Sequence, residues 1–197
     1  TSTTNPETVS GERIEELQQM AGDHMFMHAA QINDWRGNLK VYVKGDGVWV
    51  ETLDGQRHLD AMAGLWYKSV GYGRTEIADA VYAQMTAIDS PPAGSSTIPQ
   101  IELAGKVADL YPDHGARSFF VSGGSEAVET AVKMAKKYSQ LNGKGGAFKV
   151  ISRRYSYHGG TAMSVSLGRS PAADPMGPEM PGALHVTNWN SYRLPFD

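Results

Sequence analysis

The 197-residue sequence contains no cysteine, which excludes disulfides and thiolate metal sites within it. No apolar run approaches the length of a membrane-spanning helix, so no membrane partner is expected. Like charges form no block and the formal net charge is −3, so no nucleic-acid partner is expected either. Residues 1–11 are polar and lack the apolar core of a secretory signal, which favours a cytoplasmic location.

A metal site is not expected. His24 and His28 are four residues apart and could share a helix face, but the sequence shows no third ligand beside them. The stretch His24-Met25-Phe26-Met27-His28 is better explained by packing in a core or an interface.

The apolar pattern predicts an α/β protein. Strands alternate with helices across residues 77–151, which favours a mostly parallel sheet with helices on its faces. Before this region, three short strands with an Asp54-Gly55 turn predict a small β-meander. The expected strands are 41–43, 47–52, 57–59, 147–151 and 184–187, and the expected helices are 12–20, with Ile14, Leu17 and Met20 inward, 76–88 and 100–111.

The chain is organised around residues 119–135. An apolar run at 119–121 predicts a strand, Ser122-Gly123-Gly124-Ser125 a tight turn, and the following spacing a helix with Ala127, Val128, Ala131, Val132 and Ala135 on one face. Glu129 and Lys133 are expected to pair on the solvent face of this helix. The free N–H groups and dipole of its first turn form an anion site, and Ser125 can add a hydroxyl. The alternative is an ordinary strand-to-helix turn, and no Walker motif follows.

Aromatic residues interrupt the periodic pattern at two further places. Residues 61–74 place Trp66 and Tyr67 between glycines, as in a loop that packs on the core or lines a pocket. The second place is Tyr157-His158-Gly159, shortly after the strand expected at 147–151.

Together, three segments resemble the class III (omega-type) aminotransferases, which use pyridoxal 5′-phosphate (PLP) on the fold type I scaffold. The segments are Met62–Trp66 with Val70–Arg74, Ser122–Glu129, and Tyr157–Gly159. The resemblance runs from about residue 24 to about residue 193 and covers the N-terminal half of the family. It implies that residues 1–60, with helix and meander, belong to the small domain, and that residues 61–197 form an incomplete large, PLP-binding domain.

The resemblance also implies roles for individual residues. It places the PLP phosphate on Gly123, Gly124 and Ser125, in agreement with the anion site argued above, and Tyr157 against the pyridine ring. His158 would orient its loop or lie near the ring. Trp66 matches the tryptophan on the substrate side of the pocket.

The segment that the resemblance covers does not include the residues that carry out the family's chemistry. The Schiff-base lysine and the aspartate that pairs with the pyridinium nitrogen lie in the second half of the family, and none of the nine lysines here has that context. No catalytic residue is therefore assigned in this chain, which alone is not expected to turn over.

The resemblance implies an enzyme that moves an amino group from an amine or omega-amino acid to a keto acid such as pyruvate. It also implies a homodimer, with the connector 90–99 near the partner's site. Short side chains at Ala29-Ala30 and 93–95, where related enzymes have aromatics, suggest room for a bulkier amine. Two alternatives stay open: a PLP-dependent aminomutase or racemase, and a non-catalytic fragment that keeps the phosphate cradle.

Overall fold

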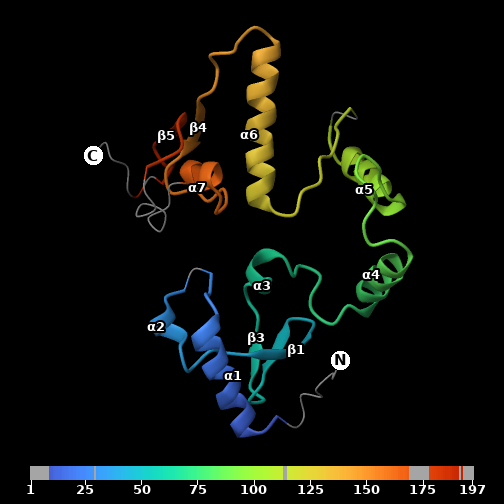
Figure 1. Cartoon of the computed structure of the whole chain (residues 1–197), viewed down its shortest axis with the longest axis vertical. Coiled ribbons are helices and arrows are strands. Elements are labelled where there is room, and N and C mark those ends of the chain that lie inside the picture. The colour runs from blue at the N-terminus through green and yellow to red at the C-terminus, as the bar shows by residue number, and fades with distance from the viewer. Residues whose placement is uncertain (1–8, 29, 113–114, 169–177, 191, 193–197) are drawn as a thin grey trace. The chain divides into compact units, whose positions relative to one another are not determined.

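The computed structural model of the chain describes residues 9–28, 30–112, 115–168, 178–190 and 192. The chain divides into two compact units, Thr1–Thr97 and Ile98–Asp197, and each is described by itself. Figure 1 shows the elements of both units in chain order. The boundary expected between residues 60 and 61, between small-domain and large-domain segments, stays a prediction.

The first unit contains the predicted β-meander. Strands β1 (Tyr42–Asp46), β2 (Trp49–Thr52) and β3 (Arg57–Leu59) form an antiparallel sheet in that order, with Trp49 of β2 opposite Leu59 of β3. The turn at Asp54-Gly55 joins β2 to β3, and Gly55 takes the positive φ of 81° that such turns require. The other elements of this unit are α1 (Gly11–His24), α2 (Ile32–Trp35), α3 (Ala63–Trp66) and α4 (Thr75–Ala87).

Helix α1 is longer than the sequence predicted. Ile14 and Leu17, expected inward, are half-buried. Ala21 is buried, whereas Met20, expected inward, is 47% exposed. The helix ends at His24 because Met25 takes extended backbone angles. His24 and His28 therefore do not share a helix face. The preferred interpretation, packing in a core, is not seen either, because Phe26 is 97% exposed; packing in an interface stays a prediction.

The second unit has a small core around α7 (Ala162–Gly168). This helix packs against α6 (Gly124–Leu141) and against both strands of a parallel pair, β4 (Val150–Arg153) and β5 (Ala183–Val186) (Figure 1). The unit begins with α5 (Ile98–Asp109). The core consists of Met163, Leu167 and Ala183, against which Val128, Val132 and Val150 pack. Among the described residues, β4 and β5 represent the expected parallel sheet.

The strand expected at 119–121 does not form among the described residues. Phe119 and Phe120 are 64% and 40% exposed, and neither belongs to a strand. A strand exists only when its backbone N–H and C=O groups bond to a neighbouring strand. No described segment pairs with residues 119–121, so this apolar run leads into α6 without regular secondary structure.

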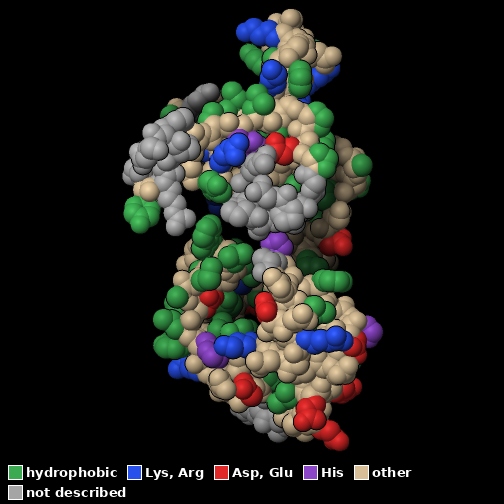
Figure 2. Space-filling model, turned by 90° about the vertical axis from the view of Figure 1, so that its left-hand side faces the viewer, with side chains coloured by type: hydrophobic (Ala, Val, Ile, Leu, Met, Phe, Trp, Pro, Cys, Tyr) green, Lys and Arg blue, Asp and Glu red, His purple; other side chains and the backbone are tan. Residues whose placement is uncertain are grey.

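Large hydrophobic side chains lie on the surface of the described part of the chain (Figure 2). The helix predicted at 76–88 forms as α4, but its apolar side chains stay exposed, with Ile77 47% and Met85 62% exposed. The same holds for Ile101 of α5, which is 63% exposed. None of the helices in the described ranges is long and apolar enough to cross a membrane.

Candidate functional site

The N-terminus of α6 has the free backbone donors that the predicted anion site requires. Gly123 is its N-cap, and the backbone N–H groups of Gly124, Ser125 and Glu126 donate to no acceptor in the described part of the chain. Nothing lies within 4 Å of the position that a Cβ would take on Gly123 or Gly124, so a ligand can approach the backbone closely. Free donors and the positive end of the helix dipole favour an anion here.

Glu126 does not fill this site. Its carboxylate turns back to accept hydrogen bonds from the Ser122 hydroxyl at 2.6 Å and the Ser122 N–H at 2.8 Å. The bond from the Ser122 hydroxyl is the main reason that the pKa of Glu126 is lowered. The carboxylate thus stabilises the turn before the helix and leaves the first-turn N–H groups free.

Ser125 joins the helix to the second predicted segment. Its Oγ accepts a hydrogen bond from the Gly160 N–H at 2.9 Å. A hydroxyl has one proton and two lone pairs, so accepting this bond leaves the proton of Ser125 available to a ligand. Ser125 can therefore hold the loop and donate to an anion at the same time.

The loop between β4 and α7 lies directly on the first turn of α6. Gly159 is buried and has φ of +129°. A Cβ at this position would lie 2.8 Å from the Cα of Ser125 and 2.7 Å from the Oγ of Ser164. Such distances are too short for carbon, so only glycine fits. The structure thus brings Gly123, Gly124 and Ser125 together with the loop that carries Tyr157 and His158.

Glu129 holds the far side of this loop. Its Oε1 accepts from the Thr161 hydroxyl at 2.7 Å, the Met163 N–H at 2.9 Å and the Ser164 N–H at 3.4 Å. These bonds cap the start of α7, and the bond from Thr161 is the main cause that lowers the pKa of Glu129.

The expectation that Glu129 pairs with Lys133 in solvent is wrong. Glu129 is half-buried beside Val128 and Val132, which face α7, whereas Ala127, Ala131 and Ala135 are exposed. The buried face of α6 is thus rotated relative to the predicted one. Thr161 lies just before α7 and Ser164 lies in its first turn, where the Ser164 hydroxyl accepts from the Thr161 N–H. Residues of this type are typical of a helix start and are the sequence signal that could have predicted α7.

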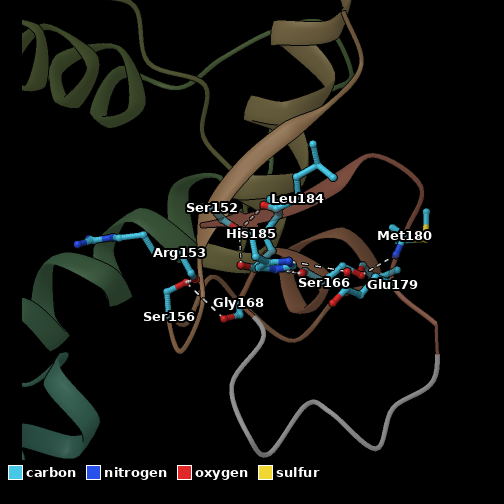
Figure 3. A network of polar contacts seen from close by, with 11 residues as sticks. Ser152, Arg153, Ser156, Ser166, Gly168, Glu179, Met180, Leu184 and His185 are labelled. Carbon is cyan, nitrogen blue, oxygen red and sulfur yellow. Dashed lines mark hydrogen bonds and ion pairs between the residues drawn. The ribbon is translucent and has the colours of Figure 1, made fainter. Parts of the chain in front are cut away.

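Serine side chains anchor the other end of the loop to the C-terminus of α7 (Figure 3). Ser156 donates from its backbone to the Gly168 carbonyl at 3.0 Å and from its hydroxyl to the Arg153 carbonyl at 2.6 Å. Ser152 of β4 donates to the Leu167 carbonyl at 2.7 Å. Both ends of α7 therefore fix the loop 154–161.

The aromatic residues of the two predicted segments are exposed. Tyr157 is 72% exposed, so its ring is free to contact a ligand, and His158 is half-buried. Trp66 belongs to the other unit and is 81% exposed.

Trp66 ends an unusual turn. The φ angles of Ala63, Gly64, Leu65 and Trp66 are 47°, 61°, 70° and 75°, so α3 is a left-handed turn. This conformation costs roughly 1–2 kcal/mol per residue that carries a Cβ. Strain of this kind persists only where neighbouring contacts enforce it, and it concentrates at functional sites.

No cluster of three or more metal-binding side chains occurs among the residues that the structure describes. The first turn of α6 instead presents free backbone N–H groups, and the loop that lies on it carries an exposed aromatic ring. Such an arrangement can hold a phosphate and stack a flat ring.

Comparisons with known proteins agree with one another. A family model described as aminotransferase class-III matches residues 32–196. The chain is 43% identical over 174 residues to a probable aminotransferase of Mycobacterium tuberculosis, covering 87% of this chain and 36% of that protein. It is 34% identical to the putrescine–pyruvate aminotransferase of Pseudomonas aeruginosa, covering 90% of this chain and 40% of the relative.

Solved structures give the same result. An (S)-enantioselective omega-transaminase from Thermomicrobium roseum matches with a TM-score of 0.85 and 36% identity. The match covers 92% of this chain and 41% of that structure. The chain thus spans about two fifths of the length of these proteins.

Proposed function

We propose that this chain, which belongs to the class III aminotransferase family and has the α/β fold of fold type I transaminases, binds the phosphate of PLP at the N-terminus of α6. The protein containing it would move an amino group from an amine or omega-amino acid to a keto acid such as pyruvate. The observation that carries the proposal is the set of free N–H groups at Gly124, Ser125 and Glu126, open to solvent beside the Ser125 hydroxyl.

The residues present fit a phosphate ester. Phosphate is an anion with several acceptor oxygens, and the first turn of α6 offers only donors and a positive dipole end. Gly123 and Gly124 let these oxygens approach the backbone, and Ser125 donates its hydroxyl while it accepts from Gly160. Glu126 is kept away from the phosphate by its bonds to Ser122.

The loop on α6 would hold the ring. Tyr157 would stack on the pyridine, a contact of about 0.5–1.5 kcal/mol. Its placement depends on both loop anchors, Gly160 on Ser125 and Thr161 on Glu129. His158, half-buried in the same loop, would orient it or lie near the ring. Trp66 would line the substrate side.

Bound PLP supplies the electron sink that weakens the bonds of the amine carbon. The contribution of this chain is to bind, orient and cover the cofactor. We assign no catalytic lysine or ring-pairing aspartate to it, so the activity is proposed for the whole protein.

Substrate and assembly are part of the proposal. One relative is named as a putrescine–pyruvate aminotransferase. We expect the same class of reaction here, between an amine and a keto acid. Short side chains at Ala30 and 93–95 favour a bulkier amine, and Ala29 lies outside the described residues. We further propose a cytoplasmic homodimer.

The test uses the intact polypeptide with PLP, putrescine and pyruvate. Formation of alanine that requires both substrates supports an aminotransferase. Isomerisation of an amino acid without a keto acid would identify an aminomutase or racemase instead. PLP binding with no conversion of any donor would favour the non-catalytic alternative.

A further inference from the structure

The left-handed turn that carries Trp66 is bound by one carboxylate. Asp60 accepts from the Met62 N–H through Oδ1 at 3.1 Å and from the Gly64 N–H through Oδ2 at 2.6 Å. The Asp60 backbone carbonyl accepts from the Ala63 N–H at 3.4 Å. Three consecutive N–H groups at the start of the turn thus point at one residue.

Tyr72 fixes the position of that carboxylate. Its hydroxyl donates to Oδ2 of Asp60 at 2.8 Å. Its backbone is paired with Gly47, next to β1, by two hydrogen bonds of 2.8 and 3.2 Å. The bond from Tyr72 is the main cause that lowers the pKa of Asp60, so the carboxylate is ionised and its bonds to the turn are charge-assisted.

Packing does not explain the position of the Trp66 ring. The residue is 81% exposed in the described part of the chain, and the neighbouring Leu65 is 61% exposed. The direction of the ring therefore follows from the backbone of residues 63–66. That backbone is unfavourable for residues with a Cβ, and the bonds to Asp60 are the contacts that compensate for it.

We infer that Asp60 is a positioning residue for Trp66, held by Tyr72, and that it determines how the substrate side of the pocket is presented to the amine. Its effect on the conformation of the turn stands on the contacts above. Its effect on substrate rests on the proposed function. Asp60 touches neither substrate nor cofactor in this proposal and acts through the turn.

The first experiment measures the turn without using activity. The intact protein is labelled with 5-fluorotryptophan, and W66F assigns the fluorine resonance of Trp66. D60A is expected to shift or broaden this resonance and to leave those of Trp35, Trp49 and Trp189 in place. D60N and Y72F each keep part of the network and should shift it less. If D60A does not fold, D60N and Y72F still show whether the bonds to Asp60 determine the environment of Trp66.

D54A is the matched control. Asp54 is also hydrogen-bonded, to Thr52 and Gln56, but in the β2–β3 turn. It should leave the Trp66 resonance unchanged. The inference is overturned if D60N and Y72F do not move that resonance, or if D54A moves it equally.

The second experiment uses steady-state kinetics of the holoenzyme with an amine and pyruvate. A misplacement of about 1 Å can cost roughly 100-fold, so D60A should lower kcat/KM for the amine by about 10- to 100-fold. The visible absorbance of bound PLP should not change. In D60A/W66A the loss should not exceed that of W66A alone, because Asp60 acts through Trp66. Additive losses would overturn this part.

The two experiments separate the hypotheses. A Trp66 shift in D60A, in a protein that converts no amine, would support the positioning role and refute the proposed function. Transamination at the native rate in D60A would support the proposed function and refute the effect of Asp60 on the substrate.

Discussion

Replacing Gly159 by alanine tests whether the loop carrying Tyr157 lies on the first turn of α6. A new Cβ would stand 2.8 Å from the Ser125 Cα and 2.7 Å from the Ser164 Oγ. The serine hydroxyl can rotate away, but the Cα belongs to the helix backbone. The variant must therefore move either the loop or the start of α6.

Two effects lower the free energy of unfolding of the Gly159→Ala variant. Overpacking a tight contact destabilises by about 1–3 kcal/mol. Gly159 also has φ of +129°, and a residue with a Cβ in such a region costs about 1–3 kcal/mol. Together they predict that the free energy of unfolding falls by about 2–6 kcal/mol. PLP affinity should fall as well, because the displaced backbone carries the phosphate donors.

The assay is urea denaturation of the intact protein, followed by titration with PLP. Gly160→Ala is the control, since nothing lies within 4 Å of its Cβ position and its N–H to Ser125 is retained. That variant should change stability by less than about 1 kcal/mol. Equal stability and equal PLP affinity in Gly159→Ala and the native protein would refute the contact between loop and helix.

Three further changes test the same site. Glu129→Ala removes the acceptor for Thr161 and two α7 N–H groups, and urea midpoints should show a loss of about 1–2 kcal/mol, whereas Lys133→Ala should be neutral. Folding lowers the pKa of Glu129, so its stabilisation is complete above the unfolded pKa of about 4.3 and disappears as pH falls through the folded pKa. The difference in stability between the native protein and Glu129→Gln should therefore shrink steadily as the pH is lowered below the unfolded pKa. Ser125→Ala should weaken PLP binding about tenfold in an absorbance titration, an effect that Ser125→Thr should partly restore. Tyr157→Ala should weaken it about 2- to 10-fold and Tyr157→Phe hardly at all, since stacking needs the ring and not the hydroxyl; equal losses in both would contradict the stacking role.

Much of the local structure could be predicted from the sequence. The β-meander with its Asp54-Gly55 turn and the glycine turn before α6 formed as expected. Such features depend on spacing over a few residues: alternation for strands, a 3.6-residue period for helices, and glycine where φ must be positive. The free N–H groups at the start of α6, where we propose that a phosphate binds, are likewise a local property of a helix start.

The errors occurred where a distant partner decides the outcome. Residues 119–121 have the composition of a strand, but strand pairing requires a neighbour, and the described residues supply none. Glu129 has the spacing of a solvent-exposed ion pair with Lys133. Its actual partners lie more than thirty residues later in the chain.

The sequence by itself indicated the family, through the resemblance of three segments, and it located helices α1, α4, α5 and α6 but not α2, α3 or α7. The four located helices follow from residue types at short separations. Only the tertiary structure placed Gly159 on Ser125 and tied Asp60 to Tyr72. It also showed that Ala63–Trp66 is left-handed, a conformation that propensity alone opposes. The physical reason is the same in each case: hydrogen bonds and close contacts between distant segments form only when the fold brings them together, and no local spacing records them.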